Sequence, residues 1–245
     1  MLKGLRKILG LGSKGKEHRR PTYFSWSREG TGMLSPSLKE NIAFFQKEFQ
    51  GCFDIVFREF QIGNGRGPKG AVLFFEGLVD KKIINDNVLK PLMYLTSLDG
   101  KMPQDINAAV ISRLNISVAK VQGEGYKEKI INAVLAGDAA LLLDHSSKAL
   151  IISVPGWERR GVEEPKAEKI IRGPREGFSE TLSVNIALIR RRIQDTRLKI
   201  KIYNLGTRSK TKVALFYMED ITKREILEEI EKRLSTVDFD MVEDV

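Results

Sequence analysis

The residues that could bind a nucleotide phosphate form one glycine-rich stretch, Gly65-Arg-Gly-Pro-Lys-Gly70, which fits the pattern G-x-G-x-x-G. A phosphate-binding loop of this kind needs a helix directly after it, so that the first amides of the helix point at the anion. Here the apolar run Ala71–Phe75 follows, and such a run is typical of a strand. We therefore interpret the stretch as a hairpin turn and not as a nucleotide site.

Groups that could act as nucleophiles, bases or metal ligands are few. The 245 residues include one cysteine, Cys52, and two histidines, His18 and His145. A single cysteine forms neither an intrachain disulfide nor a cysteine-built zinc site, and it weakly indicates a reducing compartment. Two histidines leave little room for a histidine metal site or a Ser-His-Asp triad. We expect His145, in a polar hairpin turn, to be solvated, and we expect no metal and no cofactor.

Carboxylates are numerous, but the sequence does not say which of them come within acid–base distance. The candidates are Glu76, Asp80, Asp144, Glu163, Glu164, Glu176 and Glu180. No G-x-x-x-x-G-K-[ST] motif and no G-x-S-x-G motif occurs in the chain. We therefore predict that the chain is not an enzyme. A hydrolase is the third hypothesis, and it requires two buried carboxylates that face each other in a cleft.

The net charge of +9 is concentrated in three blocks. Residues 1–20 hold seven bases and one acid, and residues 185–212 hold nine bases and one acid. Residues 213–245 hold ten acids and four bases. The last two blocks either neutralise each other in the folded chain, which is the interpretation we favour, or face partners of opposite charge.

A basic strand is predicted within the second block. In Leu198-Lys-Ile-Lys-Ile-Tyr203 the apolar residues should face the core, and Lys199, Lys201 and Tyr203 should face outward. Together with the arginines at 190–192 on the preceding helix, this outward face could bind phosphates. Lysines on a strand also protect it against pairing with other chains, and we favour that interpretation.

Membrane-spanning and secretory signals are missing from the sequence. No apolar run approaches the ~20 residues that a spanning helix needs. Residues 1–11 are basic and apolar but lack a long apolar region and a cleavage site. Residues 1–31 read as an extension that is either a frayed terminus or a short amphipathic segment on an anionic membrane surface.

Helix and strand signals alternate along the rest of the chain. Capping boxes predict helix starts at Ser37 and Thr222, and Asp80 can cap a helix that Pro91 bends or interrupts. Gly137 is the expected left-handed end of another helix. Besides the helix that starts at Asp80 and places Ile83, Ile84, Val88 and Leu89 at core spacing, the predicted helices are 38–50, 105–114, 126–135, 179–193 and 223–234. The predicted strands are 54–61, 71–75, 118–122, 139–143, 149–154, 198–203, 212–217 and 237–242.

Two stretches share the order helix, strand, turn, strand, helix. Asn41-Ile-Ala matches Asn185-Ile-Ala at an offset of 144, and the strand at 71–75 matches the one at 213–217 at an offset of 142. The difference falls in the turn, where a change in length is cheap. We predict the α/β class, with two small subdomains that each contain a mixed sheet with helices and are related by this weak internal repeat.

The predicted organisation has four parts. Residues 1–31 form the basic extension, and residues 32–154 form the first α/β subdomain. Residues 155–175 form a linker that leads into the Arg-Gly-Pro-Arg-Glu-Gly-Phe junction, and residues 176–245 form the second α/β subdomain. Because the second copy of the repeat stops soon after its second helix, we expect it to be truncated or to be completed by another chain.

Several segments resemble the GerA family, the A subunits of spore germinant receptors. They are Gly77-Leu-Val-Asp80, Leu89-Lys-Pro-Leu92, Gly137-Asp-Ala-Ala-Leu-Leu-Leu-Asp144, Gly156-Trp-Glu-Arg-Arg-Gly-Val-Glu-Glu-Pro165, Ile171-Arg-Gly-Pro-Arg-Glu-Gly-Phe-Ser-Glu180 and Asn185-Ile-Ala-Leu-Ile-Arg-Arg-Arg-Ile193. The resemblance covers about residues 38–235, and it is most specific between Gly156 and Ile193. The residues that carry the motif and the expected junction between the subdomains are Trp157, Glu158, Glu164, Pro165, Arg172, Gly173, Pro174, Arg175, Glu176, Gly177, Phe178, Glu180, Asn185, Arg190, Arg191 and Arg192.

The resemblance implies a soluble N-terminal region of two α/β subdomains, similar in shape to substrate-binding proteins, followed by a multi-span membrane domain. Family members lie in the spore inner membrane with B and C subunits, respond to amino acids or sugars, and trigger ion release and germination. This chain ends before any span, so we expect the soluble region alone, on the cytoplasmic (core) side, attached to the membrane through segments that it lacks. The implied partners are B and C subunits, other A subunits and an amino acid or sugar germinant, with no nucleic acid.

Three hypotheses follow for the function. The first is the soluble N-terminal domain of a germinant receptor A subunit, which is non-enzymatic and acts in nutrient sensing, signal relay and subunit assembly. The alternative is a module that binds anionic lipid or nucleic acid through the basic block at 185–212. The third is the hydrolase described above. The resemblance implies no catalytic residues, and we know of no ligand-binding motif in this region.

Overall fold

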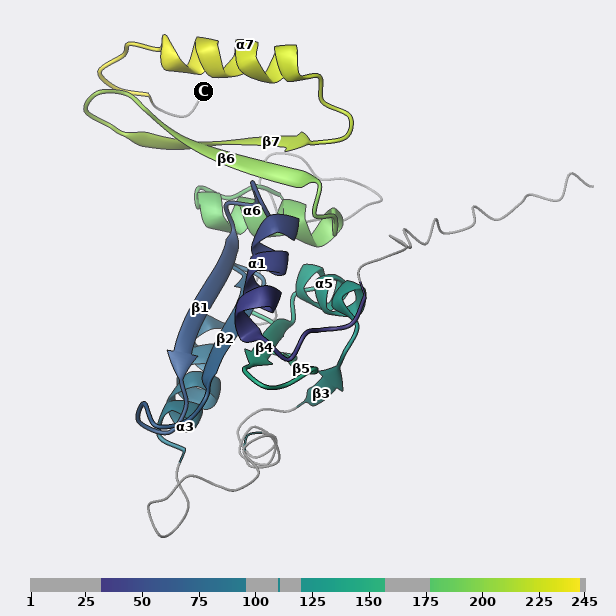
Figure 1. The fold of residues 1–245 in the computed structure, drawn as a ribbon. Helices are drawn as coiled ribbons and strands as arrows, with labels where there is room; N and C mark the ends of the chain where they lie inside the picture. The colour runs from purple at the N-terminus through teal and green to yellow at the C-terminus, as the bar shows by residue number, and fades with distance from the viewer. Residues whose placement is uncertain (1–31, 96–109, 111–119, 157–176, 243–245) are drawn as a thin grey trace, which may run out of the picture. The chain divides into compact units, whose positions relative to one another are not determined.

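The computed structural model describes residues 32–95, 110, 120–156 and 177–242. It is an α/β structure with helices packed on sheets, so the predicted class is confirmed (Figure 1). Its elements are α1 (Leu38–Glu48), β1 (Ile55–Gln61), β2 (Lys69–Phe75), α2 (Lys81–Ile83), η1 (Ile84–Leu89), α3 (Lys90–Met93), β3 (Val121–Glu124), α5 (Lys127–Leu135), β4 (Ala139–Leu143), β5 (Ala149–Ile152), α6 (Leu182–Arg192), β6 (Leu198–Leu205), β7 (Thr211–Met218) and α7 (Arg224–Ser235).

The larger sheet has five strands in the order β1-β2-β4-β5-β3. Each pair of neighbouring strands is antiparallel, where the sequence analysis expected mixed sheets. Two of these pairs, β1 with β2 and β4 with β5, are hairpins, and a short turn joins only antiparallel strands. The other two pairs join strands that are far apart or separated by other elements in the chain. The glycine-rich stretch forms the first of the hairpin turns, as predicted, with Gly65 at φ +80°, and its last two residues, Lys69 and Gly70, begin β2.

Helices cover both faces of this sheet because its side chains alternate between them. On one face Leu73 and Phe75 of β2 pack in a buried cluster with residues of α1 and α5. On the other face Val72 and Phe74 pack with residues of η1 and α3. All five residues of β4 are buried, which places this strand in the middle of both clusters.

A π-helical turn precedes α3. Asp80 caps the start of α2 through its carboxylate, which accepts hydrogen bonds from the amides of Lys82 and Ile83. Further along, the amide of Lys90 donates to the carbonyl of Asn85, five residues back, and Pro91 follows. Proline has no amide hydrogen to donate to a carbonyl of the preceding turn, so it interrupts the regular hydrogen bonds of the helix. The predicted interruption is found as the π-helical turn, one turn before Pro91 itself.

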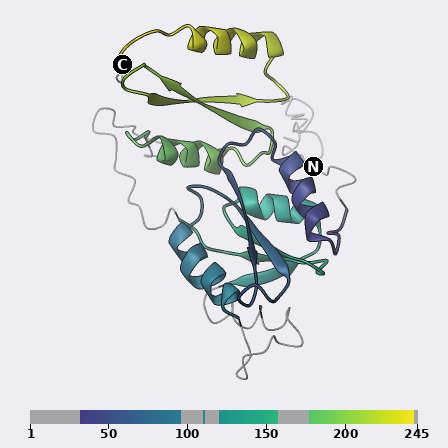
Figure 2. The same ribbon diagram turned by 60° about the vertical axis from the view of Figure 1, so that its left-hand side comes forward.

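The smaller sheet is the hairpin of β6 and β7, paired over eight residues from Leu198↔Met218 to Leu205↔Thr211. Figure 2 shows this hairpin with α6 on one side and α7 on the other. The order α6-β6-β7-α7 matches α1-β1-β2-α2 in the first half of the chain. Within the described residues, this second copy therefore has the core elements of the repeat and lacks counterparts of β3, β4 and β5.

The two copies of the repeat begin their first helix in the same way. Asn41 donates to the carbonyl of Ser35 at 2.7 Å and accepts from the amide of Ser35 at 3.0 Å. Asn185 makes the same two contacts with Ser179, both at 2.7 Å. The sequence match between the two asparagines therefore reflects one shared helix entry.

Two local predictions in the second half are wrong. Thr222 does not cap α7, because its amide donates to Met218 and Lys223 takes the capping position without a side-chain bond. Residues 237–242 form no strand and instead contact the loop between β6 and β7, as in the bond from the Thr207 amide to the Phe239 carbonyl. The predicted helix at 105–114 lies almost entirely outside the described residues.

Candidate functional site

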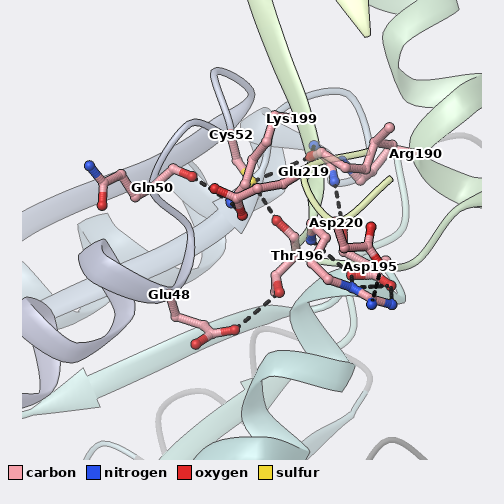
Figure 3. Close-up of polar contacts among 11 residues, drawn as sticks. Glu48, Gln50, Cys52, Arg190, Asp195, Thr196, Lys199, Glu219 and Asp220 are labelled. Atoms are coloured by element: carbon pink, nitrogen blue, oxygen red, sulfur yellow. Dashed lines mark hydrogen bonds and ion pairs between the residues drawn. The ribbon is translucent and has the colours of Figure 1, made fainter. Parts of the chain in front are cut away.

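A network of polar contacts joins the five-stranded sheet to the hairpin (Figure 3). It forms where the chain leaves α1 for β1 and where it leaves α6 for β6. We call this network the polar joint and define it as Glu48, Gln50, Gly51, Cys52, Asp54, Arg190, Asp195, Thr196, Leu198, Lys199 and Ile200. Most of these contacts link residues that are more than 130 positions apart in the sequence.

Arg190 is the centre of the polar joint, and its side chain is fully buried. Its Nε and Nη2 donate to the two carboxylate oxygens of Asp54 at 2.9 and 2.8 Å, a bidentate ion pair. Its Nη1 donates to the carbonyl of Asp195 at 3.1 Å, and Nη2 also donates to the carbonyl of Leu198 at 3.2 Å. The guanidinium lies 4.5 Å from the centre of the Phe75 ring. Each nitrogen is therefore bonded, which is what a buried arginine requires.

Lys199 is also buried, although the strand pattern predicts an outward side chain. Its Nζ donates to the carbonyl of Gln50 at 2.6 Å and lies 3.3 Å from the carboxylate of Glu219. The lysine stem covers Gly51, which has a φ of +79°. A Cβ at Gly51 would lie 3.2 Å from Cδ of Lys199, so glycine suits both the backbone and the close approach.

Cys52 contributes a buried thiol and a backbone contact. Its Sγ lies 3.5 Å from the carbonyl of Thr196 and 3.7 Å from that of Leu198. Burial raises the pKa of the Cys52 thiol, so it stays protonated and donates to these carbonyls. The amide of Ile200 donates to the carbonyl of Gly51 at 3.1 Å, within a parallel bridge between Cys52 and Ile200. Such a thiol is a structural donor and not a nucleophile.

The contacts of the polar joint are ion pairs and hydrogen bonds that link distant parts of the chain. The buried carboxylate of Asp54 accepts hydrogen bonds at both of its oxygens from the guanidinium of Arg190. In the described ranges, no group of three or more histidine, cysteine, aspartate or glutamate residues could hold a metal ion. The hydrolase hypothesis thus gains no support from these residues. The geometry instead suits a mechanical connection between two sheets.

The predicted motif residues fall into two groups. Trp157, Glu158, Glu164, Pro165, Arg172, Gly173, Pro174, Arg175 and Glu176 lie outside the described residues. Gly177, Phe178 and Glu180 precede α6, and Phe178 is 73% exposed. Asn185 holds the start of α6, Arg190 is buried in the polar joint, and Arg191 and Arg192 lie nearer the surface.

Four of the nine bases in the block at 185–212 pair with acids of the block that follows it. Arg197 pairs with Asp220 at 2.5 Å and also with Asp195. Lys201 pairs with Glu231 on α7. Lys199 pairs with Glu219 as described above, and Arg208 lies 3.5 Å from Asp240. The favoured interpretation of the charge pattern agrees with these pairs, and the phosphate-binding alternative loses its predicted surface because Arg190 and Lys199 are buried.

Asp54, Cys52 and Gln50 were not foreseen as site residues. Their partners lie on distant elements, so no local pattern identifies them. The helical spacing gave a weak indication for Arg190, because Ile186 lies four residues earlier on the same face of α6 and is buried as well. Other motif segments also meet: Asp80 donates its amide to Val154, and Gly156 donates to Leu78, so the first motif packs against the start of the junction.

None of the helices in the described ranges is long and apolar enough to cross a membrane. A model of the family Bacillus/Clostridium GerA spore germination protein matches residues 43–245. The spore germination protein GerLA of Bacillus cereus is 38% identical over 211 residues, which make up 85% of this chain and 42% of GerLA. The uncharacterized membrane protein YfkQ of Bacillus subtilis is 36% identical over 210 residues, 85% of this chain and 39% of YfkQ.

The spore germination protein KA of Bacillus subtilis is 32% identical over 218 residues, 88% of this chain and 39% of that protein. The chain thus spans about two fifths of the length of these curated relatives. Its fold is similar to the crystal structure of the N-terminal domain of the A subunit of the Bacillus megaterium spore germinant receptor GerK3, with a TM-score of 0.66 over 85% of this chain and 75% of that one, at 24% identity. Because the family model matches far more than half of the chain, this protein belongs to the GerA family of spore germination proteins.

Proposed function

We propose that this chain acts as the N-terminal domain of a germinant receptor A subunit, and that it relays a nutrient signal during spore germination without catalysing a reaction. The observation that carries the proposal is the family match over residues 43–245. The fold similarity to the corresponding domain of GerK3 supports it. The non-enzymatic part of the proposal is supported by the relatives, which are named as spore germination proteins.

The polar joint supports the relay part of the proposal. A signal that passes from one sheet to the other needs contacts that hold the two together, and buried charged pairs provide such contacts with a defined geometry. The ion pair of Asp54 and Arg190 joins the start of β1 in the five-stranded sheet to α6, the helix that precedes the hairpin. The Arg172–Phe178 segment, proposed as a second connection between the two subdomains at 32–154 and 176–245, lies mostly outside the described residues.

The proposed partners are the B and C subunits of the receptor and other A subunits, with an amino acid or a sugar as the germinant. The proposed location is the spore inner membrane, with these residues on the cytoplasmic (core) side. The names of the curated relatives as spore germination proteins support this setting. The alternative, a phosphate-surface binder, is not favoured because its bases pair with acids of the same chain.

The test is germination of spores that lack the gene for this protein. We expect spores without it to lose the fall in optical density that amino acids or sugars trigger, and a plasmid copy to restore it. Spore yield and heat resistance are the controls, because both should stay normal if the protein acts only in germination. An unchanged response to every amino acid and sugar in the panel would refute the sensing role.

Assembly is tested separately by affinity purification from spore membranes. We expect an epitope-tagged protein to co-purify with subunits of the B and C type encoded beside it. Recovery of the tagged protein alone, under conditions that keep another membrane complex intact, would refute the assembly role and leave the sensing role untouched.

A further inference from the structure

We propose that the polar joint is a lock, so that the β6–β7 hairpin and the five-stranded sheet move as one rigid body. Two lobes that close over a ligand need a hinge between them and a surface along which they part. The contacts between these two sheets are instead buried hydrogen bonds and an ion pair that cross from one sheet to the other. The inference concerns these residues alone and stands independently of what the protein senses.

The first argument is the bonding of Arg190. All three nitrogens of its guanidinium are hydrogen-bonded, and they bond to both parts of the molecule: Asp54 precedes β1, whereas Asp195 and Leu198 belong to the segment that leads into β6. Parting the two sheets would separate a buried cation from a buried anion. Such a separation is strongly unfavourable unless water reaches both groups.

The second argument is that the lock has more than one contact. On the β6 side, Nζ of Lys199 donates a hydrogen bond to the carbonyl of Gln50, and the amide of Ile200 donates one to the carbonyl of Gly51. On the α6 side, a Cβ at Gly77 would lie 3.0 Å from Cβ of Ala187, so the helix rests directly on the turn after β2. A rotation about any one of these contacts breaks the others.

The third argument is the direction of the contacts. Arg190 bonds Asp54 from α6, and Thr196 bonds Glu48 at 3.0 Å from the loop after it. These two bonds meet opposite ends of the segment that joins α1 to β1. Sliding along this segment is blocked because each bond fixes one end. A ligand would therefore change the orientation of the whole body and not the angle between its two parts.

The test measures the distance between the two sheets in the full chain by double electron–electron resonance. Spin labels go on cysteines introduced at Glu59 of β1 and Lys212 of β7, which are both exposed. The native Cys52 is buried and stays in place, and mass spectrometry checks that it remains unlabelled. We expect one narrow distance distribution, unchanged by amino acids or sugars at millimolar concentration.

Two substitutions open the lock in different ways. Asp54→Asn keeps the size of the side chain but leaves Arg190 without its anion, and Arg190→Lys keeps the charge but loses the bidentate fork. We expect both to broaden the distribution or add a second peak. We also expect amide hydrogen exchange at 198–218 to become at least about tenfold faster, with little change at 139–143, because the loss concerns the joint between the sheets.

The matched control is Asp86→Asn, which removes an exposed ion pair with Lys90 on the first sheet's helices. It should change neither the distance distribution nor the exchange of the hairpin. A wild-type distribution that is broad or has two peaks would overturn the lock, since the sheets would then part while the ion pair is intact. Identical distributions in wild type, Asp54→Asn and Arg190→Lys would overturn the role of Arg190.

Discussion

Three consecutive arginines end α6, and each has a different environment. Arg190 is fully buried, Arg191 is half-buried and Arg192 is exposed. Successive residues of a helix point about 100° apart, so a basic run in the sequence does not make a basic surface. The same reasoning applies to the basic strand, in which Lys199 is buried and Lys201 reaches Glu231. At the residue scale, charge in this segment serves internal pairing.

Glu124 offers a test of a single carboxylate. It accepts hydrogen bonds from the amides of Tyr126 and Gly125, both at 2.9 Å, at the start of α5. The bond from the Tyr126 amide is the main reason why the pKa of Glu124 lies below its ordinary value of 4.5. A lowered pKa in the folded state means stability that is present above the ordinary pKa and is lost as the pH falls through the folded value.

We therefore expect Glu124→Gln to reduce the acid sensitivity of the protein. The urea midpoint of the wild type should fall more between about pH 5.5 and pH 3 than that of the variant, because only the wild type protonates this group. Glu59→Gln, at an exposed position on β1, controls for removal of one negative charge. Equal acid slopes for Glu124→Gln and the wild type would contradict the assignment.

Residue contacts of the polar joint could not be predicted from the sequence. Asp54 and Arg190 are 136 positions apart, and neither neighbourhood carries a pattern that names the other. Helix and strand periods report which side of an element is apolar, but they do not report which distant element covers it. The motif at 156–193 includes Arg190 of α6. Its pairing with Asp54 is seen only in the folded structure.

At the scale of elements, more of the structure could be predicted from the sequence than at the scale of residue contacts. Both hairpins of the larger sheet, the caps of α1 and α2 and the end of α5 at Gly137 are where the local signals placed them. These features depend on turn residues and on side chains that bond their own neighbours, so nearby residues determine them. The sheet order, in which β3 lies at an edge beside β5, depends on contacts between distant segments and was not predicted.

Gly156 tests the packing of one turn against another. A Cβ there would lie 2.6 Å from the carbonyl carbon and oxygen of Val79 and 3.0 Å from the amide nitrogen of Asp80. These are backbone atoms, held by hydrogen bonds on both sides, so they cannot move aside as a flexible side chain would. We expect Gly156→Ala to lower the free energy of unfolding by about 1–3 kcal/mol, as overpacking does elsewhere.

Chemical denaturation of Gly156→Ala measures this loss. Gly123→Ala on β3 is the control, because the nearest atom to its Cβ is Cδ of Lys148 at 4.0 Å. It should be close to neutral. Equal stability of the two variants would mean that the backbone at Val79 and Asp80 moves away from an added Cβ at little cost, which would contradict the prediction.

At the scale of the whole molecule, the lock predicts how the protein unfolds. If the two sheets form one body, heat should unfold them in one cooperative transition whose calorimetric and van't Hoff enthalpies agree. Asp54→Asn should separate this into two transitions, with the hairpin melting first because it has the smaller core. Two resolved transitions in the wild type would indicate that the sheets are thermodynamically independent.

The hairpin also has a consequence for behaviour in concentrated solution. β7 pairs with β6 along one side, and no other strand in the described ranges pairs with its second side. Residues 213–218 of this strand are apolar, and Lys212 is its one charge. Backbone amides and carbonyls along such a rim attract the same rim of a neighbouring molecule. Self-association by this route should increase with protein concentration and depend little on added salt, since the strand has few charges for salt to screen.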